Sequence, residues 1–142
     1  MAYAAFSDEW ARAFGERIRS NEAYRRAAAS WEWPMIFLVR QDPQLGIREE
    51  MGVYLDLYRG ECREARTATA AELASAPYVL SADAYTWKQV LDGKLEPIGA
   101  MMRGKVKVAR GSLVTLARYV VAAKCLVDSA TEVPTDFPEG LQ

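Results

Sequence analysis

WKQVLDGKLEPIGAMMRGKVKV, residues 87–108, is the stretch on which an interpretation of the whole chain can be built. Trp87, Val90 and Leu91 stand at positions i, i+3 and i+4, so they share one face of a helix. Gly93 can take the left-handed backbone conformation that ends a helix. The first part of the stretch therefore predicts a helix with a single apolar face that stops at Gly93.

A second short helix and a strand follow. Pro97 suits the first turn of a helix, and Ile98, Met101 and Met102 repeat the i, i+3, i+4 spacing. Residues 105–108 alternate charged and apolar side chains, as a half-buried strand does. The stretch thus predicts a helix–turn–helix–strand unit. Its apolar face is either ordinary core or the wall of a loosely filled cavity, to which flexible thioether chains are well suited.

The composition is that of one ordinary globular domain. The chain has 142 residues and a net charge of −1, with acids and bases interspersed. This argues against nucleic acid as the main partner, since nucleic-acid-binding domains carry a basic stripe. No apolar run approaches the ~20 residues that a membrane span needs. We expect a folded domain over residues 1–130 and a tail over residues 131–142.

The chain ends and the cysteines bear on the cellular compartment. The first residues lack a basic region before an apolar one, so a signal peptide is not expected. The last three residues are not a peroxisomal address. Cys62 and Cys125 are far apart in sequence and are expected to be free thiols in a reducing compartment. Together these features favour a cytoplasmic protein.

The chain contains no histidine. The commonest general base and the commonest metal ligand are therefore missing. Neither a Ser–His–Asp nor a Cys–His arrangement can form, and no two cysteines have the spacing of a structural zinc site. We expect no catalytic residue, no metal and no cofactor, and hence a non-enzymatic function.

The remaining segments follow an order typical of an α+β fold, with one sheet and helices gathered around it. Helices are predicted over residues 8–19 and 22–30, and strands over residues 33–39, 51–58, 61–67 and 77–81. The run 33–39 is apolar on both faces, which predicts a central strand covered on two sides. Residues 113–129 predict one long helix, apolar almost all round, that is buried on most sides or partly faces something apolar that is not protein. Helix caps are predicted at Ser7, Asn21, Thr69, Asp83 and Ser112.

The opening stretch also carries the motif of a family. The ordered set Trp87, Gly93-Lys94, Pro97 and Gly104-Lys105, followed by a strand, resembles the sterol carrier protein 2-like (SCP2) lipid-binding domain. Segments 21–25, 55–57 and 60–63 are similar to a bacterial branch of that family. Gly111-Ser112 stands where members often have Gly-Asp, and serine caps a helix as aspartate does. The resemblance covers residues 7–128.

The resemblance implies a fold and a function. The implied fold is a single five-stranded, mostly antiparallel sheet covered by helices, with an apolar tunnel between sheet and helices. The implied function is the binding of a fatty acid, a fatty acyl-CoA, a phospholipid or a sterol-like molecule in that cavity. The ligand would then be transferred inside the cell between membranes or enzymes.

Three surfaces supply candidate residues for the cavity wall: the sheet, the opening stretch and the last helix. For each residue the alternative is plain core, but the surplus of methionine and aromatic side chains favours a cavity. The candidates are Met35, Phe37, Tyr54, Trp87, Leu91, Ile98, Met101, Met102, Leu116, Tyr119, Val120 and Ala123. Each methylene of a ligand buried there would contribute ~0.8 kcal/mol.

Basic side chains gather in and just after the opening stretch, with Glu96 as the one acid among them. They are Lys94, Arg103, Lys105, Lys107 and Arg110. One interpretation is a solvated strand face. The other is a basic rim at the cavity mouth, which would meet a carboxylate, a CoA phosphate or an anionic membrane surface.

Two other classes of function stay open. An enzyme could use Tyr54 and Asp56 on a substrate in the cavity, which requires a carboxyl group with a raised pKa. Cys62 as a nucleophile would depend on Arg63 for activation. The acids and arginines of residues 56–66 are, however, expected to form cross-strand ion pairs. An accessory module could instead present the ligand or the apolar last helix to a partner enzyme, or form a homodimer through that helix.

Overall fold

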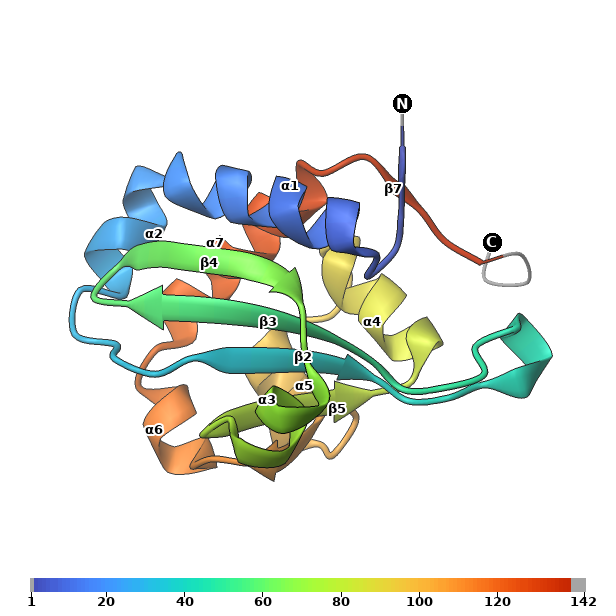
Figure 1. Cartoon of the computed structure of the whole chain (residues 1–142). Coiled ribbons are helices and arrows are strands. Elements are labelled where there is room, and N and C mark those ends of the chain that lie inside the picture. Colours follow the sequence, from blue (N-terminus) through green and yellow to red (C-terminus); the bar gives the residue numbers. More distant parts are fainter. Residues whose placement is uncertain (1, 139–142) are drawn as a thin grey trace.

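A five-stranded sheet runs through the middle of the protein, seen in a computed structural model that describes residues 2–138 (Figure 1). Its strands, in spatial order, are β4 (Glu61–Thr67), β3 (Met51–Tyr58), β2 (Met35–Val39), β5 (Tyr78–Ala82) and β6 (Lys107–Arg110). Strands β2 and β5 run parallel and the other neighbours run antiparallel. The sheet is therefore mixed, which corrects the expectation of a mostly antiparallel one. The parallel pair arises because the chain crosses from β4 through α3 (Ala70–Ser75) before it enters β5.

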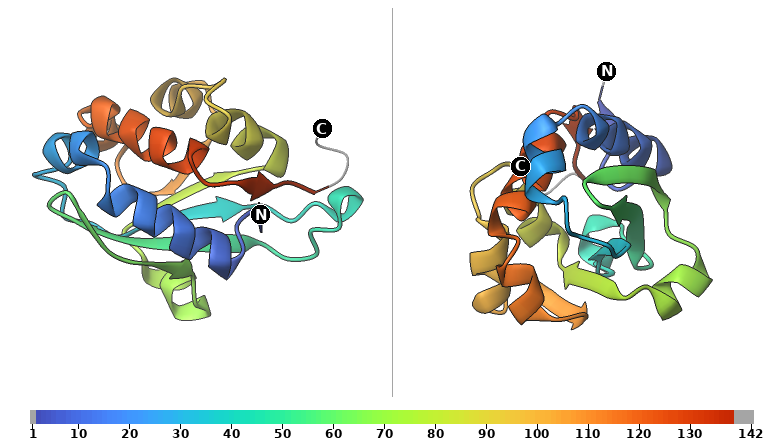
Figure 2. Two further views of the ribbon diagram at one scale, coloured as in Figure 1. Left: turned by 90° about the horizontal axis from the view of Figure 1, so that it is seen from above. Right: turned by 90° about the vertical axis from the view of Figure 1, so that its left-hand side faces the viewer.

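Helices cover the two faces of the sheet unequally. Helix α3 lies alone on one face, while most other helices lie on the opposite face (Figure 1). Those other helices are α1 (Asp8–Arg19), α2 (Glu22–Ala27), α4 (Ala84–Leu91), α5 (Pro97–Met102), α6 (Leu113–Ala117) and α7 (Val120–Thr131). Seen from above, α7 lies between α1 on one side and α4 and α5 on the other (Figure 2). A short 3₁₀ turn, Pro43–Leu45, lies in the loop between β2 and β3.

Strand β2 is the centre of this arrangement, as its doubly apolar pattern predicts. All five of its residues are buried. Met35 and Phe37 face the main core beneath the helices, whereas Ile36 and Leu38 face a smaller cluster on the α3 side. The charged strand β4 lies at the edge of the sheet and pairs antiparallel with β3.

The predicted helix caps are confirmed by the hydrogen bonds of the first turns. Ser7, Asn21, Asp83 and Ser112 each accept a backbone N–H of the first turn of their helix. Thr69 and Glu72 form the reciprocal bonds of a capping box at α3. Local sequence therefore determines where these helices begin.

The segment expected to be one long helix is two helices. Helix α6 ends at Ala117, and α7 begins at Val120 after a break at Arg118 and Tyr119. The segment is also not buried on most sides, because Val114 is 69% exposed and Val121 is 62% exposed. The break turns the Tyr119 ring inward, where it packs edge-on against Trp31. The strand expected at residues 105–108 lies two residues later, at β6.

The two ends of the described chain lie side by side. Strand β1 (Tyr3–Ala4) pairs parallel with β7 (Thr135–Asp136), and the indole N–H of Trp10 donates to Thr135 Oγ1 at 2.8 Å. Residues 132–138, within the segment expected to be a tail, thus lie against the N-terminal segment. Residues 139–142 of that segment lie outside the described residues.

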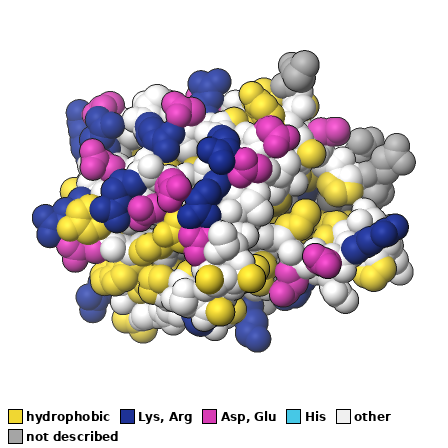
Figure 3. All heavy atoms as spheres, in the orientation of Figure 1, with side chains coloured by type: hydrophobic (Ala, Val, Ile, Leu, Met, Phe, Trp, Pro, Cys, Tyr) yellow, Lys and Arg dark blue, Asp and Glu magenta, His cyan; other side chains and the backbone are white. Residues whose placement is uncertain are grey.

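Acidic and basic side chains alternate over the surface of α1 and β4 (Figure 3). The expected cross-strand ion pair is present: an Nη of Arg63 lies 3.1 Å from Oδ1 of Asp56. Arg66 bridges Glu64 on β4 and Glu72 on α3. Within residues 2–138, no helix has both the length and the apolar character needed to cross a membrane.

Candidate functional site

An apolar hollow lies between the inner face of the sheet and the helices that cover it. The sheet supplies its floor, α4 and α5 supply one wall, and α1, α2, α6 and α7 supply the rest. The hollow is lined by Phe14, Tyr24, Ala28, Trp31, Met35, Phe37, Leu57, Leu80, Trp87, Val90, Leu91, Pro97, Ile98, Met101, Val106, Leu116, Tyr119, Ala122, Ala123, Leu126, Val127 and Ala130. No charged residue is among them.

The structure brings most of the residues predicted for a cavity wall to this hollow. They are Met35, Phe37, Trp87, Leu91, Ile98, Met101, Leu116, Tyr119 and Ala123. Tyr54 lies outside it, because it alternates with the buried Val53 and Leu55 and so faces the α3 side of the sheet. Met102 and Val120 also lie outside the hollow and are 70% and 43% exposed. Each directly follows a residue that lines the hollow, Met101 and Tyr119 respectively, and so points in a different direction from its helix.

Several lining residues were missed by the sequence interpretation. Val90 could have been found, because it shares the helix face of Trp87 and Leu91. Leu57 and Leu80 could have been found from strand alternation once the inward face of the sheet was known. The helical spacing of Tyr24, Ala28 and Trp31 does predict a shared inner face, but not that this face reaches the hollow, because the packing of α2 against α7 decides that.

The polar tips of the lining side chains are mostly bonded elsewhere. The Trp87 indole N–H donates to the Leu38 carbonyl at 2.9 Å, and the Trp31 indole N–H donates to the Trp33 carbonyl at 2.7 Å. The Tyr119 hydroxyl is 2.9 Å from the Ser30 hydroxyl, and the two share a hydrogen bond. What these residues present to the hollow is therefore ring carbon.

The hollow is small in this structure. The volume open to the centre of a water-sized sphere is about 50 Å³. A single water needs ~10–15 Å³ by the same measure, so there is room for a few waters but not for a long alkyl chain. The expected apolar tunnel is therefore not shown; the structure has a small apolar hollow at the place where the tunnel was expected.

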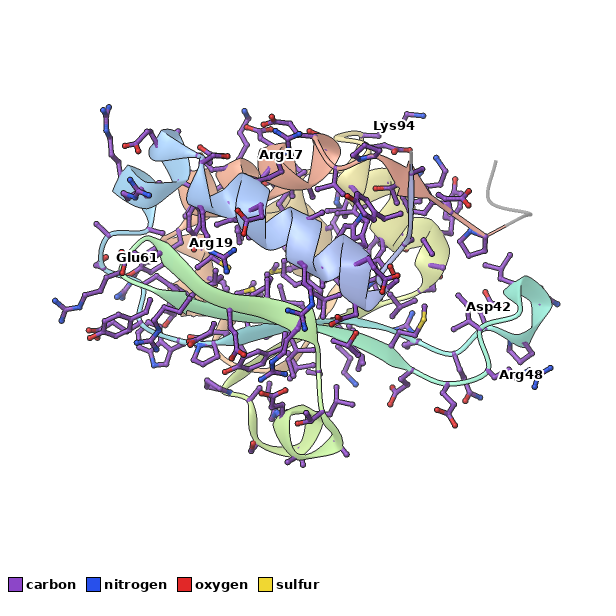
Figure 4. All side chains as sticks on the ribbon, turned by 45° about the horizontal axis from the view of Figure 1, so that its top comes forward. Arg17, Arg19, Asp42, Arg48, Glu61 and Lys94 are labelled. Atoms are coloured by element: carbon purple, nitrogen blue, oxygen red, sulfur yellow. The ribbon has the colours of Figure 1, made fainter. Side chains whose placement is uncertain are left out.

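The predicted basic rim lies on the segment that carries α5 and leads into β6. Lys94, Arg103, Lys105 and Lys107 are all exposed, and none forms an ion pair within residues 2–138. Lys94 lies at the outer edge of this segment, away from the sheet (Figure 4). Arg110 differs from them, because its guanidinium donates to the Leu73 and Ala74 carbonyls at the end of α3.

The groups considered for catalysis are held in structural roles. Burial raises the pKa of the Cys62 thiol to about 11, so the thiol is not a ready nucleophile at neutral pH. Its backbone carbonyl accepts a hydrogen bond from Arg19, which lies between α1 and β4 (Figure 4). The Asp56 carboxylate receives two N–H bonds from Arg63. No cluster of metal-ligating side chains occurs within residues 2–138.

Comparison with solved structures finds close similarity across nearly the whole chain. A crystal structure of sterol carrier protein 2 shares 40% sequence identity, with a TM-score of 0.84, over 91% of this chain and 98% of that one. A solution structure from Thermus thermophilus, described as a conserved hypothetical protein and possibly a sterol carrier protein, shares 36% identity. It also has a TM-score of 0.84, over 99% of this chain and 98% of that one.

A more distant neighbour shares the fold alone. The sterol carrier protein 2 of Aedes aegypti, solved in complex with the C16 fatty acid palmitate, is 20% identical with a TM-score of 0.51. That match covers 85% of this chain and 98% of the mosquito chain. Models of protein families and the curated proteins yielded no match.

Proposed function

The chain belongs to the sterol carrier protein 2 family, and from that premise we propose that it binds an apolar ligand in the hollow and transfers it without chemical change. The observation that carries the proposal is the lining: apolar side chains, contributed by sheet and helices together, surround an unfilled space. A well-packed core leaves few such spaces. Ligand classes that suit this lining are fatty acids, fatty acyl-CoA, phospholipids and sterol-like molecules.

Binding requires the hollow to enlarge. Met101 and Ile98 lie on the six-residue helix α5, which is tied to its neighbours by short loops and no sheet pairing. Movement of this helix away from α7, together with new rotamers of the methionine side chain, would open space for an alkyl chain. Each methylene then transferred from water contributes ~0.8 kcal/mol, which offsets the cost of opening. Palmitate in the Aedes aegypti complex is a ligand of this kind.

The basic rim and the apolar side chains beside it favour contact with an anionic partner. Met102, Val114 and Val121 are exposed on α5, α6 and α7, which contact one another in the order α6–α5–α7. Lys105 and Lys107 follow directly after α5. We propose that this surface meets the carboxylate or phosphate of a ligand, or a transiently bound anionic membrane, in the cytoplasm.

The test begins with native mass spectrometry of the purified protein, followed by extraction and identification of the co-purifying molecules. We expect a bound lipid, and saturable displacement of a fluorescent C16 fatty acid by palmitate. The Ala123→Phe variant places a ring in the hollow and should lower affinity at least tenfold. Ala117→Phe, on the exposed side of α6, is the matched control and should leave affinity unchanged.

Other outcomes would contradict the proposal. A stable dimer with no extractable ligand and no probe binding would favour the interaction module. Turnover of an acyl-CoA that is lost in Asp56→Asn would favour the enzyme.

A further inference from the structure

The side chains that line the hollow carry four N–H or O–H groups, and one of them has no partner. Trp31, Trp87 and Tyr119 are hydrogen-bonded as described above. The fourth group is the hydroxyl of Tyr24. Within residues 2–138, Tyr24 forms hydrogen bonds only through its backbone: its N–H donates to Asn21 Oδ1, and its carbonyl accepts from Ala28.

Tyr24 is buried, yet its hydroxyl oxygen is not sealed in by protein. The residue as a whole is only 1% exposed. Within residues 2–138, the only fully enclosed side-chain nitrogen or oxygen without a hydrogen bond is Nε of Arg110. The Tyr24 oxygen, which also lacks a hydrogen bond, therefore keeps a small open surface. Such groups normally receive a partner, because an unsatisfied buried hydroxyl is unfavourable.

The surroundings of this hydroxyl are uncharged. Burial raises the pKa of Tyr24 far above its usual value, with smaller contributions from the thiols of Cys62 and Cys125. The group is thus a neutral O–H throughout the physiological range. No lysine or arginine lines the hollow, so a carboxylate placed inside would be buried without a counter-ion. An uncharged oxygen would meet the hydroxyl without that cost.

We propose that the Tyr24 hydroxyl faces the hollow and is the hydrogen-bonding group for a ligand's polar atom, so that the preferred ligand is an apolar molecule carrying an uncharged oxygen, such as an alcohol or a carbonyl. This inference rests on the proposed function and narrows it. It assigns an inner polar subsite at α2, separate from the basic rim on the α5 segment. A charged head group would lie at the rim and an uncharged oxygen at Tyr24.

The experiment compares three ligands with the same chain length: 1-dodecanol, n-dodecane and dodecanoate. Titration follows the fluorescence of Trp31 and Trp87, which line the hollow. We expect wild-type protein to bind 1-dodecanol about tenfold more tightly than n-dodecane, as one hydrogen bond would give. Tyr24→Phe should abolish this preference while leaving n-dodecane affinity unchanged. Tyr119→Phe, whose lost hydroxyl is bonded to Ser30, is the matched control and should retain the preference.

The results distinguish a failure of the Tyr24 subsite from a failure of the proposed lipid-binding function. If Tyr24→Phe keeps the full preference for 1-dodecanol, or if dodecanoate binds in a way that depends on the Tyr24 hydroxyl, the subsite is wrong and the lipid-binding function stands. If wild-type protein binds none of the three ligands, the proposed function itself fails, and the subsite with it. Melting of the ligand-free protein gives a second readout. Tyr24→Phe should melt at the same or a higher temperature, and a marked drop would mean that the hydroxyl has a protein partner.

Discussion

Trp87 joins the sheet to the helices through three different contacts. Its indole N–H bonds to the β2 backbone at Leu38, its ring stacks on Phe37 with centroids 5.1 Å apart, and it also meets Phe6. The side chain is buried and lines the hollow. Trp87, a residue of the family motif, therefore packs the sheet against the helices and also forms part of the wall of the candidate site.

Replacement of Trp87 by alanine should lower the free energy of unfolding by about 3–5 kcal/mol, because it removes a large buried ring and leaves the Leu38 carbonyl without its donor. Urea denaturation measures this loss. Tyr85→Ala, on the exposed side of the same helix, is the matched control and should cost less than about 1 kcal/mol. Equal losses in the two variants would contradict the assigned role of Trp87.

Glu72 provides a pH-dependent contribution to stability. The hydrogen bond from Arg66 lowers the pKa of the Glu72 carboxyl from 4.5 to about 2. A carboxyl whose pKa is lower in the folded protein stabilises it above the unfolded pKa, and that contribution is lost as the pH falls. We expect wild-type stability to decline between about pH 4.5 and pH 2 more steeply than that of Glu72→Gln.

Chemical denaturation at stepped pH measures the difference between the two curves. Glu61→Gln is the control, since Glu61 forms no ion pair within residues 2–138, and its curve should follow that of the wild type. Parallel curves for wild type and Glu72→Gln would mean that the Arg66 contact contributes nothing to stability.

At the scale of elements, the turn between α4 and α5 depends on one glycine. Gly93 has φ of +77°, and within residues 2–138 no heavy atom beyond its two chain neighbours lies within 4 Å of the position that a Cβ would occupy. Its role is therefore conformational and not steric. The turn sets the direction of α5, and thereby the position of Ile98 and Met101 over the hollow.

Gly93→Ala should cost about 1 kcal/mol, whereas Gly93→Asn should cost less, because asparagine tolerates the left-handed conformation better. Thermal melting of both variants tests the order. If alanine were tolerated better than asparagine, the turn would not require a left-handed residue in solution.

At the scale of the whole molecule, the strand pair β1–β7 joins segments from opposite ends of the chain. Its side-chain link is the bond from Trp10 to Thr135, and Phe6 stacks on Trp10 with centroids 5.0 Å apart. Because α1 packs on β4 and α7, this link holds the first helix against the rest of the core.

Thr135→Val keeps the shape of the side chain but leaves the Trp10 N–H without its partner, which should cost about 1–3 kcal/mol. Hydrogen exchange should then become faster in residues 3–10 before it does so in the central sheet. Thr131→Val is the control, since the Thr131 hydroxyl donates to the carbonyl of Asp128 within its own helix. Equal destabilisation by both variants would show that the terminal link is not the cause.

Much of the fold was predictable because its determinants are local. Caps at Ser7, Asn21 and Asp83 begin their helices through bonds made within three residues. The alternation of β3 identified it as a strand, and the doubly apolar run of β2 predicted its central place in the sheet, which the structure has. Tyr54 was misplaced because alternation tells which residues share a face, but not which face meets the larger set of helices.

By itself, the sequence carried the motif that resembles the family. It also determined the helix starts, the central strand and a set of side chains that share one apolar face, because these follow from spacing and from short-range hydrogen bonds. Only the tertiary structure decided that β5 runs parallel to β2, that the last helix breaks at Tyr119, and that Tyr24 and Trp31 come to the hollow. The physical reason is that crossovers, breaks and voids depend on contacts between segments far apart in the chain. The size of the hollow depends on the distance between the sheet and the helices that pack on it. No single segment of the sequence determines that distance.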